Sequence, residues 1–148
     1  MTKLERFIAI EEIKRLKARY FRHLDTKNWH EFGSVFASNG TLEVGPAGVK
    51  PRKETGAAAI VSWVRGAFEG ATTIHHGHMP EIEILEPRRA TGIWAMDDIV
   101  IWPNRWLHGW GHYHEVYVLE SDAWKIASSC LMHLRVEIHE HEYGGTRS

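Results

Sequence analysis

The sequence predicts an α+β fold in which helices come first and a curved, mostly antiparallel sheet comes last. Three observations lead to this prediction. Apolar residues recur at helical spacing before residue 70, alternation of apolar and polar residues dominates after it, and only short turns separate the alternating segments. Because long bent strands covered by helices form a cone, we expect a pocket inside the sheet.

Three helices are expected, over residues 4–24, 26–37 and 57–68. In the first helix, Ile13 and Tyr20 belong to an apolar stripe that repeats every three or four residues, and Asp25 follows at its C-terminal end. The pair Asn39-Gly40 is expected to end the second helix, because such residues adopt the backbone conformation that closes helices.

The expected strands begin with a short one over residues 41–44, followed by a loop over 45–56 that is rich in glycine and proline. Four long strands come after the third helix. They are expected over Thr73–Leu85, Ala90–Trp102, Trp106–Glu120 and Ala123–Ile138. We expect a single domain spanning residues 1–148, with residues 138–148 as a C-terminal tail.

Composition narrows the classes of partner. The formal charge of −1, from 18 basic and 19 acidic residues, gives no basic field that would hold nucleic acid. No apolar run reaches the roughly 18 residues of a membrane span, and the N-terminus has no signal-peptide pattern. We therefore expect a cytoplasmic protein that binds neither nucleic acid nor membrane. Eleven histidines and seven tryptophans suggest a hydrophobic site with groups that transfer protons.

The segment "TTIHHGHMPEIEI" places His75, His76 and His78 at the start of a predicted strand. Side chains alternate between the two faces of a strand, so His75 and His76 point to opposite sides. A regular strand whose two isoleucines face the core would turn His76 and His78 inward. A one-residue bulge at the intervening glycine or proline would turn His75 inward instead.

Metal and cofactor motifs are weak. Adjacent strand histidines cannot easily share one ion, although His112 with His114, or His139 with His141, could contribute to a site from one face. The chain has neither the HExxH motif nor a glycine-rich phosphate loop. We expect no metal and no organic cofactor.

Four segments carry a family resemblance: "YFRHLDTKNWHEF", "IHHGHMPEIEI", "ATGIWAMDDIVIW" and "WKIASSCLMHLRV". They resemble the SnoaL-like branch of the nuclear-transport-factor-2-like superfamily over nearly the whole chain. The pattern is most similar to bile-acid 7α-dehydratase, and also resembles scytalone dehydratase and hexachlorocyclohexane dehydrochlorinase. The resemblance implies the α+β cone already expected from the residue pattern.

The resemblance also implies a catalytic set. The family's pocket aspartate falls on Asp25, its catalytic histidine on His75, and two further catalytic positions of the bile-acid enzyme on Tyr20 and Asp98. Other positions are secondary candidates for the pocket. These are His76, His78, Trp94, His133 and Arg135.

This set predicts acid–base chemistry. A carboxylate bonded to one imidazole nitrogen fixes the tautomer and aims the other nitrogen at the substrate, so His75 with Asp25 would act as a general base. Tyr20 and Asp98 would then stabilise an enolate or protonate a leaving hydroxyl. We expect a cofactor-independent, dehydratase-like lyase acting on a hydrophobic polycyclic or steroid-like substrate. The alternatives are an isomerase, a polyketide cyclase, or a non-catalytic binding module or partner subunit.

The outer face of the sheet is also expected to be partly apolar. Its candidate residues are Trp106, Trp110, Tyr113 and Tyr117. An apolar outer face favours association of copies. We expect a homo-oligomer, either a dimer or the trimer that the resemblance implies.

Overall fold

The computed structural model describes residues 1–46 and 52–145. Its helices are α1 (Lys3–Asp25), α2 (Trp29–Ser34) and α3 (Ala57–Ala67). Its strands are β1 (Phe36–Pro46), β2 (Arg52–Thr55), β3 (Thr72–Glu86), β4 (Arg89–Trp102), β5 (Arg105–Glu120) and β6 (Ala123–His139). The four long strands agree with the sequence prediction to within one residue at each end. No helix in the described ranges is long and apolar enough to cross a membrane.

Helix α1 is closed at both ends by specific backbone contacts. Thr2 and Glu5 form a capping box, which satisfies amide groups that the first turn leaves free. At the other end, Lys27 has a φ of 59°, and its amide donates to the carbonyl of Leu24. The helix therefore stops at Asp25, whose carboxylate is left at the edge of the buried face.

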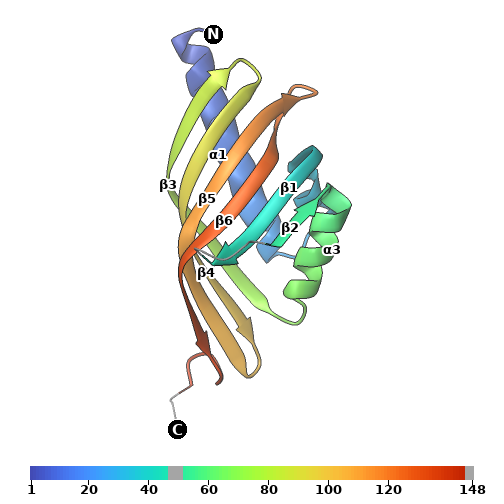
Figure 1. The fold of residues 1–148 in the computed structure, drawn as a ribbon, viewed down its shortest axis with the longest axis vertical. Coiled ribbons are helices and arrows are strands. Elements are labelled where there is room, and N and C mark those ends of the chain that lie inside the picture. Colours follow the sequence, from blue (N-terminus) through green and yellow to red (C-terminus); the bar gives the residue numbers. More distant parts are fainter. Residues whose placement is uncertain (47–51, 146–148) are drawn as a thin grey trace.

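All six strands belong to one curved, unclosed sheet with the order β2-β1-β6-β5-β4-β3. Strands β1 and β6 are parallel, and every other neighbouring pair is antiparallel. The sheet is thus mixed but mostly antiparallel, as the sequence predicts. Figure 1 shows the long strands curving around α1, with α3 beside β1 and β2.

The helices and the inner face of the sheet share one hydrophobic core. From α1 it receives the predicted stripe, which includes Ile13 and Tyr20 at 0% and 3% exposure. From β5 it receives Tyr113 and Tyr117, both almost fully buried. Helices packed on one face of a curved sheet make the cone-shaped α+β architecture that the sequence predicts.

The region after α2 differs from the prediction. Helix α2 ends at Ser34, because Phe36 already pairs with Ile126 as the first residue of β1. Asn39-Gly40 therefore does not end a helix but forms an irregularity inside β1, where Asn39 has a φ of 57°. The predicted strand over residues 41–44 is confirmed as part of β1.

The predicted loop over residues 45–56 is wrong in part. Residues 52–55 form β2, because an edge strand can pair with β1 despite its charged side chains. Residues 47–51 of that loop lie outside the described residues. The predicted tail begins too early, since β6 continues to His139, and residues 146–148 also lie outside the described part.

The prediction for the outer face is also wrong in part, because two of its four residues are buried in the core. On β5 the odd-numbered residues point inward, so Tyr113 and Tyr117 belong to the core. The even-numbered residues point outward and include Trp106 and Trp110. The outer face is aromatic and rich in histidine, with Trp106 stacked on His139 at 3.9 Å between ring centroids.

Candidate active site

A bulge in β3 decides which histidine faces inward. His78 lies opposite Ala95, whereas Glu81 lies opposite Ile93, so two residues of β3 face a single residue of β4. The extra residue is accommodated at Met79, whose φ is 40°, beside Pro80. The bulge reverses the alternation, and His75 becomes 6% exposed and faces the core. Of the two orientations left open by the sequence, the structure has the bulged one.

Asp25 and His75 meet where α1 packs on β3. The Nδ1 of His75 lies 2.7 Å from Oδ1 of Asp25, and the backbone amide of His75 donates to Oδ2 at 2.8 Å. The hydroxyl of Thr73 donates to Oδ1 at 2.9 Å, and the ammonium of Lys27 donates to that hydroxyl at 3.2 Å. The carboxylate is therefore held from three directions, which fixes its orientation.

The contact with Asp25 sets the tautomer of the imidazole. Because a carboxylate accepts hydrogen bonds, Nδ1 of His75 carries the proton in the neutral ring, and Nε2 is a free acceptor. Nε2 lies 3.6 Å from Oδ2 of Asp98, on the neighbouring strand β4. Asp98 is 5% exposed, and its Oδ1 has no hydrogen-bond partner among the described residues. The free nitrogen and the buried carboxyl can thus exchange a proton through a small movement or through a substrate.

Both groups line an internal cavity of about 210 Å³. Its wall is mainly apolar, with five polar or aromatic-hydroxyl side chains in it: Tyr20, His75, Asp98, Tyr113 and His133. The other lining residues are Leu24, Leu42, Val44, Trp63, Val64, Ala67, Phe68, Val100, Leu107, Leu131 and Val136. An apolar cavity with a few convergent polar groups is typical of a small-molecule site.

Aromatic rings enclose His75. Phe21 lies nearly parallel to the imidazole with 6.5 Å between ring centroids, and Phe68 is tilted against it at 5.6 Å. Gly77 leaves room for this arrangement, since a Cβ there would be 2.7 Å from Cε2 of Phe21. The rings limit the access of water to the pair of Asp25 and His75 and hold the imidazole in one plane.

Tyr20 and Tyr113 form a phenolic wall of the cavity. Burial raises the pKa of Tyr20 well above its usual value, and the negative charge of Glu115 adds to this, while the neighbouring Tyr113 phenol opposes it. Burial likewise raises the pKa of Tyr113. Both phenols therefore stay protonated at neutral pH and can donate hydrogen bonds to a ligand oxygen.

A buried ion pair behind this wall was missed by the sequence analysis. The ammonium of Lys17 lies 2.5 Å from Oε1 of Glu115, and both side chains are fully buried. It also lies 3.6 Å from the ring centroid of Tyr113 and 3.9 Å from that of Tyr20. Helical spacing could have indicated that Lys17 is buried, because Lys17 is three residues before Tyr20 on the apolar stripe.

The same carboxylate of Glu115 anchors further groups of the sheet. It accepts a hydrogen bond from Ser129 at 2.8 Å and another from Tyr117, whose hydroxyl in turn accepts from the indole of Trp94 at 2.9 Å.

The sequence analysis also missed Thr73, which donates to Asp25, although the two-residue period of β3 places it on the same face as His75.

The secondary candidates divide into two groups. His133 lines the cavity, and its Nδ1 lies 3.3 Å from the carbonyl of Gly45. The structure does not bring the others to the cavity: Trp94 is in the core beside Tyr117, and His76, His78 and Arg135 are exposed. His78 instead pairs with Asp97 at 2.7 Å, because it precedes the bulge and lies on the same outer face of β3 as His76.

Within residues 1–46 and 52–145, no three histidine, cysteine, aspartate or glutamate side chains are grouped to hold a metal ion. Of the histidine pairs considered from the sequence, one lies on β5, and the other joins the last residue of β6 to the segment after it. His112 and His114 are 6.5 Å apart between ring centroids, and His139 and His141 are 5.6 Å apart. Neither pair has a third side chain to complete a site in this part of the chain.

Comparison with known proteins agrees with this architecture. The sequence model of the SnoaL-like domain matches residues 5–129. A candidate scytalone dehydratase from Novosphingobium aromaticivorans has a TM-score of 0.80 at 18% identity, with 99% of this chain and 100% of that chain covered. A type 3 hexachlorocyclohexane dehydrochlorinase from Novosphingobium barchaimii has a TM-score of 0.78 at 15% identity, covering 93% and 94%. A Mycobacterium tuberculosis protein of unknown function has a TM-score of 0.79 at 22% identity, covering 91% and 78%.

Proposed function

This chain belongs to the SnoaL-like domain family, and from that premise we propose that it is a dehydratase-like lyase. Its substrate would be a hydrophobic polycyclic or steroid-like molecule with a carbonyl group, and its reaction a β-elimination that needs no metal or organic cofactor. The single observation that carries this proposal is the contact of 2.7 Å between Asp25 and His75 at the wall of an apolar cavity.

The proposed reaction starts with proton abstraction. Nε2 of His75 removes the proton next to the carbonyl, and the electrons of the broken C–H bond form an enolate. The phenol of Tyr20 donates a hydrogen bond to the enolate oxygen. Asp25 stabilises the imidazolium, because the ring then carries a positive charge against its carboxylate. A positioned base of this kind accelerates a reaction by about 10²–10⁴-fold.

The elimination is completed on the other side of the cavity. As the enolate electrons return to form the carbonyl and a carbon–carbon double bond, the β C–O bond breaks. The imidazolium of His75 passes the proton it has taken, by way of the Asp98 carboxylate, to the departing hydroxide, which leaves as water; Nε2 and Oδ2 are 3.6 Å apart. The proton balance closes without an external reactant.

The cavity supports an apolar substrate. Among the residues that the structure describes, sixteen line the cavity, and eleven of these carry neither a charged group nor a hydroxyl nor an imidazole. The two histidines are the only basic side chains in that described lining. Its volume of about 210 Å³ is below the 300–1,000 Å³ usual for sites that bind drug-sized ligands. A steroid-sized substrate would therefore extend from the cavity to its mouth.

We also propose that the protein is a homo-oligomer, a dimer or a trimer. Two large apolar side chains near the end of β6 support this, Leu134 at 71% and Ile138 at 58% exposure. Ile138 lies opposite the inward-facing Leu107, so it continues the inner face of the sheet beyond the cavity. Exposed apolar residues at this end of β6 are typical of a surface that another copy covers. Sedimentation equilibrium of the wild type and of Leu134→Lys tests the association: a monomeric wild type contradicts it.

A substrate screen tests the lyase. Hydroxylated steroids, bile-acid thioesters and aromatic polyketides are assayed for thermal stabilisation and for turnover with the wild type, His75→Ala and Asp25→Asn. Loss of water from a substrate that depends on both residues supports the proposal. Isomerised product points to an isomerase, ring closure to a cyclase, and binding without turnover to a binding module. Equal turnover by all three proteins eliminates the proposed mechanism.

A further inference from the structure

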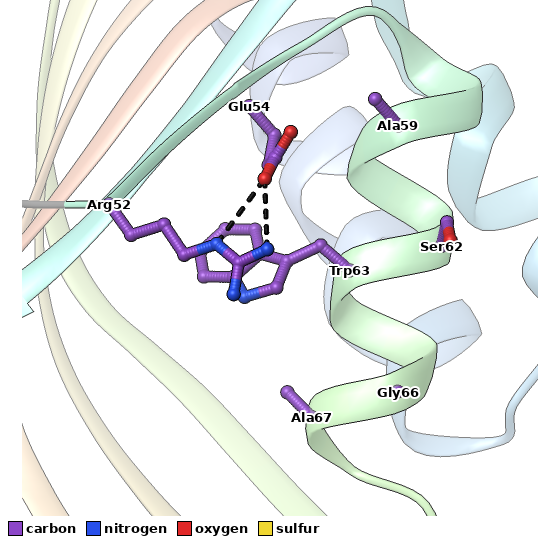
Figure 2. A pocket seen from close by; sticks show the side chains of 7 residues that line it. All are labelled: Arg52, Glu54, Ala59, Ser62, Trp63, Gly66 and Ala67. Atoms are coloured by element: carbon purple, nitrogen blue, oxygen red, sulfur yellow. Dashed lines mark hydrogen bonds and ion pairs between the residues drawn. The ribbon is translucent and has the colours of Figure 1, made fainter.

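An open groove of about 500 Å³ lies outside the cavity, between β2 and α3. Its lining residues are Arg52, Glu54, Ala59, Ser62, Trp63, Gly66 and Ala67 (Figure 2). Two of them, Trp63 and Ala67, also line the inner cavity. The indole of Trp63 is therefore part of the wall between groove and cavity, and a ligand that leaves the cavity past α3 enters this groove.

Arg52 is held in the groove in a defined orientation. Its guanidinium carbon lies 5.0 Å from the ring centroid of Trp63, so the cation packs on the indole. Nε and Nη2 both donate to Oε1 of Glu54, at 3.2 and 3.0 Å. Figure 2 shows that the remaining nitrogen, Nη1, points away from Glu54. A guanidinium has five N–H donors, so Nη1 still offers two to a ligand.

We propose that this groove binds the carboxylate of an amphipathic ligand whose apolar body occupies the inner cavity. The inference rests on the proposed use of the cavity as the substrate site, and it narrows the substrate class to carboxylates. The cavity is too small for a large ring system alone, so such a ligand projects its tail to the mouth. There Nη1 of Arg52 meets a carboxylate in a charge-assisted hydrogen bond.

The charges in the groove limit the strength of this contact. Of the seven described lining residues, only Arg52 and Glu54 are charged, so the cation is already paired with one carboxylate. The ligand contact gains from the free donors of Nη1 but is weakened by repulsion from Glu54 and by solvent, because the arginine side chain is 62% exposed. A modest, salt-sensitive preference for the acid is the expected result.

The test uses two ligands of the same shape, naphthylbutanoate and naphthylbutanamide. Their dissociation constants are measured by isothermal titration at low ionic strength, and no turnover is needed. The wild type is expected to bind the carboxylate about tenfold more tightly than the amide. Arg52→Gln is expected to reduce this ratio to about twofold or less, with the affinity for the amide unchanged. Since Arg52 is exposed, the variant should fold normally, which circular dichroism checks.

Lys53→Gln is the matched control. It removes one positive charge from the neighbouring residue of β2, whose ammonium pairs with Glu43 at 3.5 Å outside the groove. The tenfold ratio should persist in this variant. Equal affinity of the wild type for the two ligands, including no measurable affinity for either, overturns the inference, and so does a ratio that Arg52→Gln leaves unchanged. An arginine-dependent ratio in a protein without lyase activity supports the groove while removing the proposed reaction.

Discussion

Replacing Lys17 by methionine tests a fully buried charge of the fold. The ammonium and the Glu115 carboxylate are both fully buried, and burial lowers the pKa of Lys17 while Glu115 opposes that shift. Methionine keeps the length and apolar stem of the side chain but leaves the carboxylate without its counter-ion. Ser129 and Tyr117 would still donate to Glu115, so two hydrogen bonds remain.

The expected loss is large for one substitution. Removing one partner of a buried ion pair costs about 3–5 kcal/mol, and the remaining hydroxyl donors place Lys17→Met near the lower end. For a protein of this size, 1 kcal/mol corresponds to about 2–4 °C in Tm, so Tm should fall by about 6–12 °C. Urea unfolding followed by circular dichroism gives the free energy, and calorimetry gives Tm.

Two further variants make the result specific. Lys14→Met removes an exposed pair with Glu11 from the same helix and should cost less than about 1 kcal/mol. Combining Lys17→Met with Glu115→Gln should recover part of the loss, because no unpaired charge remains buried. If Lys17→Met costs no more than Lys14→Met, the buried pair with Glu115 does not stabilise the fold.

Three other outcomes are expected. Gly77→Ala places a Cβ against Phe21 and should lower the free energy of unfolding in urea by about 1–3 kcal/mol. Gly66→Ala has open space around its Cβ and should be neutral or stabilising. Equal effects of the two substitutions would contradict the close packing of Gly77 on Phe21. Gly109→Ala collides with Oδ1 of Asp98, so it should reduce turnover far more than stability, and unchanged turnover argues against a role for that carboxyl. Burial raises the pKa of Tyr20, Tyr113 and Tyr117, so above pH 10 these phenols ionise only in the unfolded chain. The free energy of unfolding should then fall by up to about 1.4 kcal/mol per pH unit for each tyrosine. Buried Lys17, whose pKa is lowered, opposes this fall below the usual pKa of lysine, and a free energy that stays constant from pH 9 to 12 contradicts the prediction.

Periodicity in the sequence was sufficient for the long elements. The stripe through Ile13 and Tyr20 predicted α1, and alternation predicted β3 to β6, because both patterns are set by which side chains face the core. It failed for residues 36–40 and 52–55, where Phe36 and the charged segment 52–55 join the sheet through pairing with distant strands. Such pairing is a tertiary effect that local propensity does not contain.

The candidate site shows the same division. Alternation alone would have placed His76 in the pocket, and only the family resemblance favoured His75. The bulge that turns His75 inward lies at Met79, and the neighbouring Pro80 is its main indication in the sequence. Lys17 and Glu115 are 98 residues apart, so no spacing rule pairs them. Contacts between α1 and the sheet, such as this ion pair, could be identified only from the structure.

The central claim is that Asp25 holds His75 as a base with a free Nε2 in the cavity. Nitrogen-15 NMR of the imidazole rings, with His75→Gln used to assign the signal, measures which nitrogen carries the proton. The account predicts the Nδ1–H tautomer for neutral His75 in the wild type, and a mixture or the opposite tautomer in Asp25→Asn. A protonated Nε2 in neutral His75 of the wild type would contradict the account.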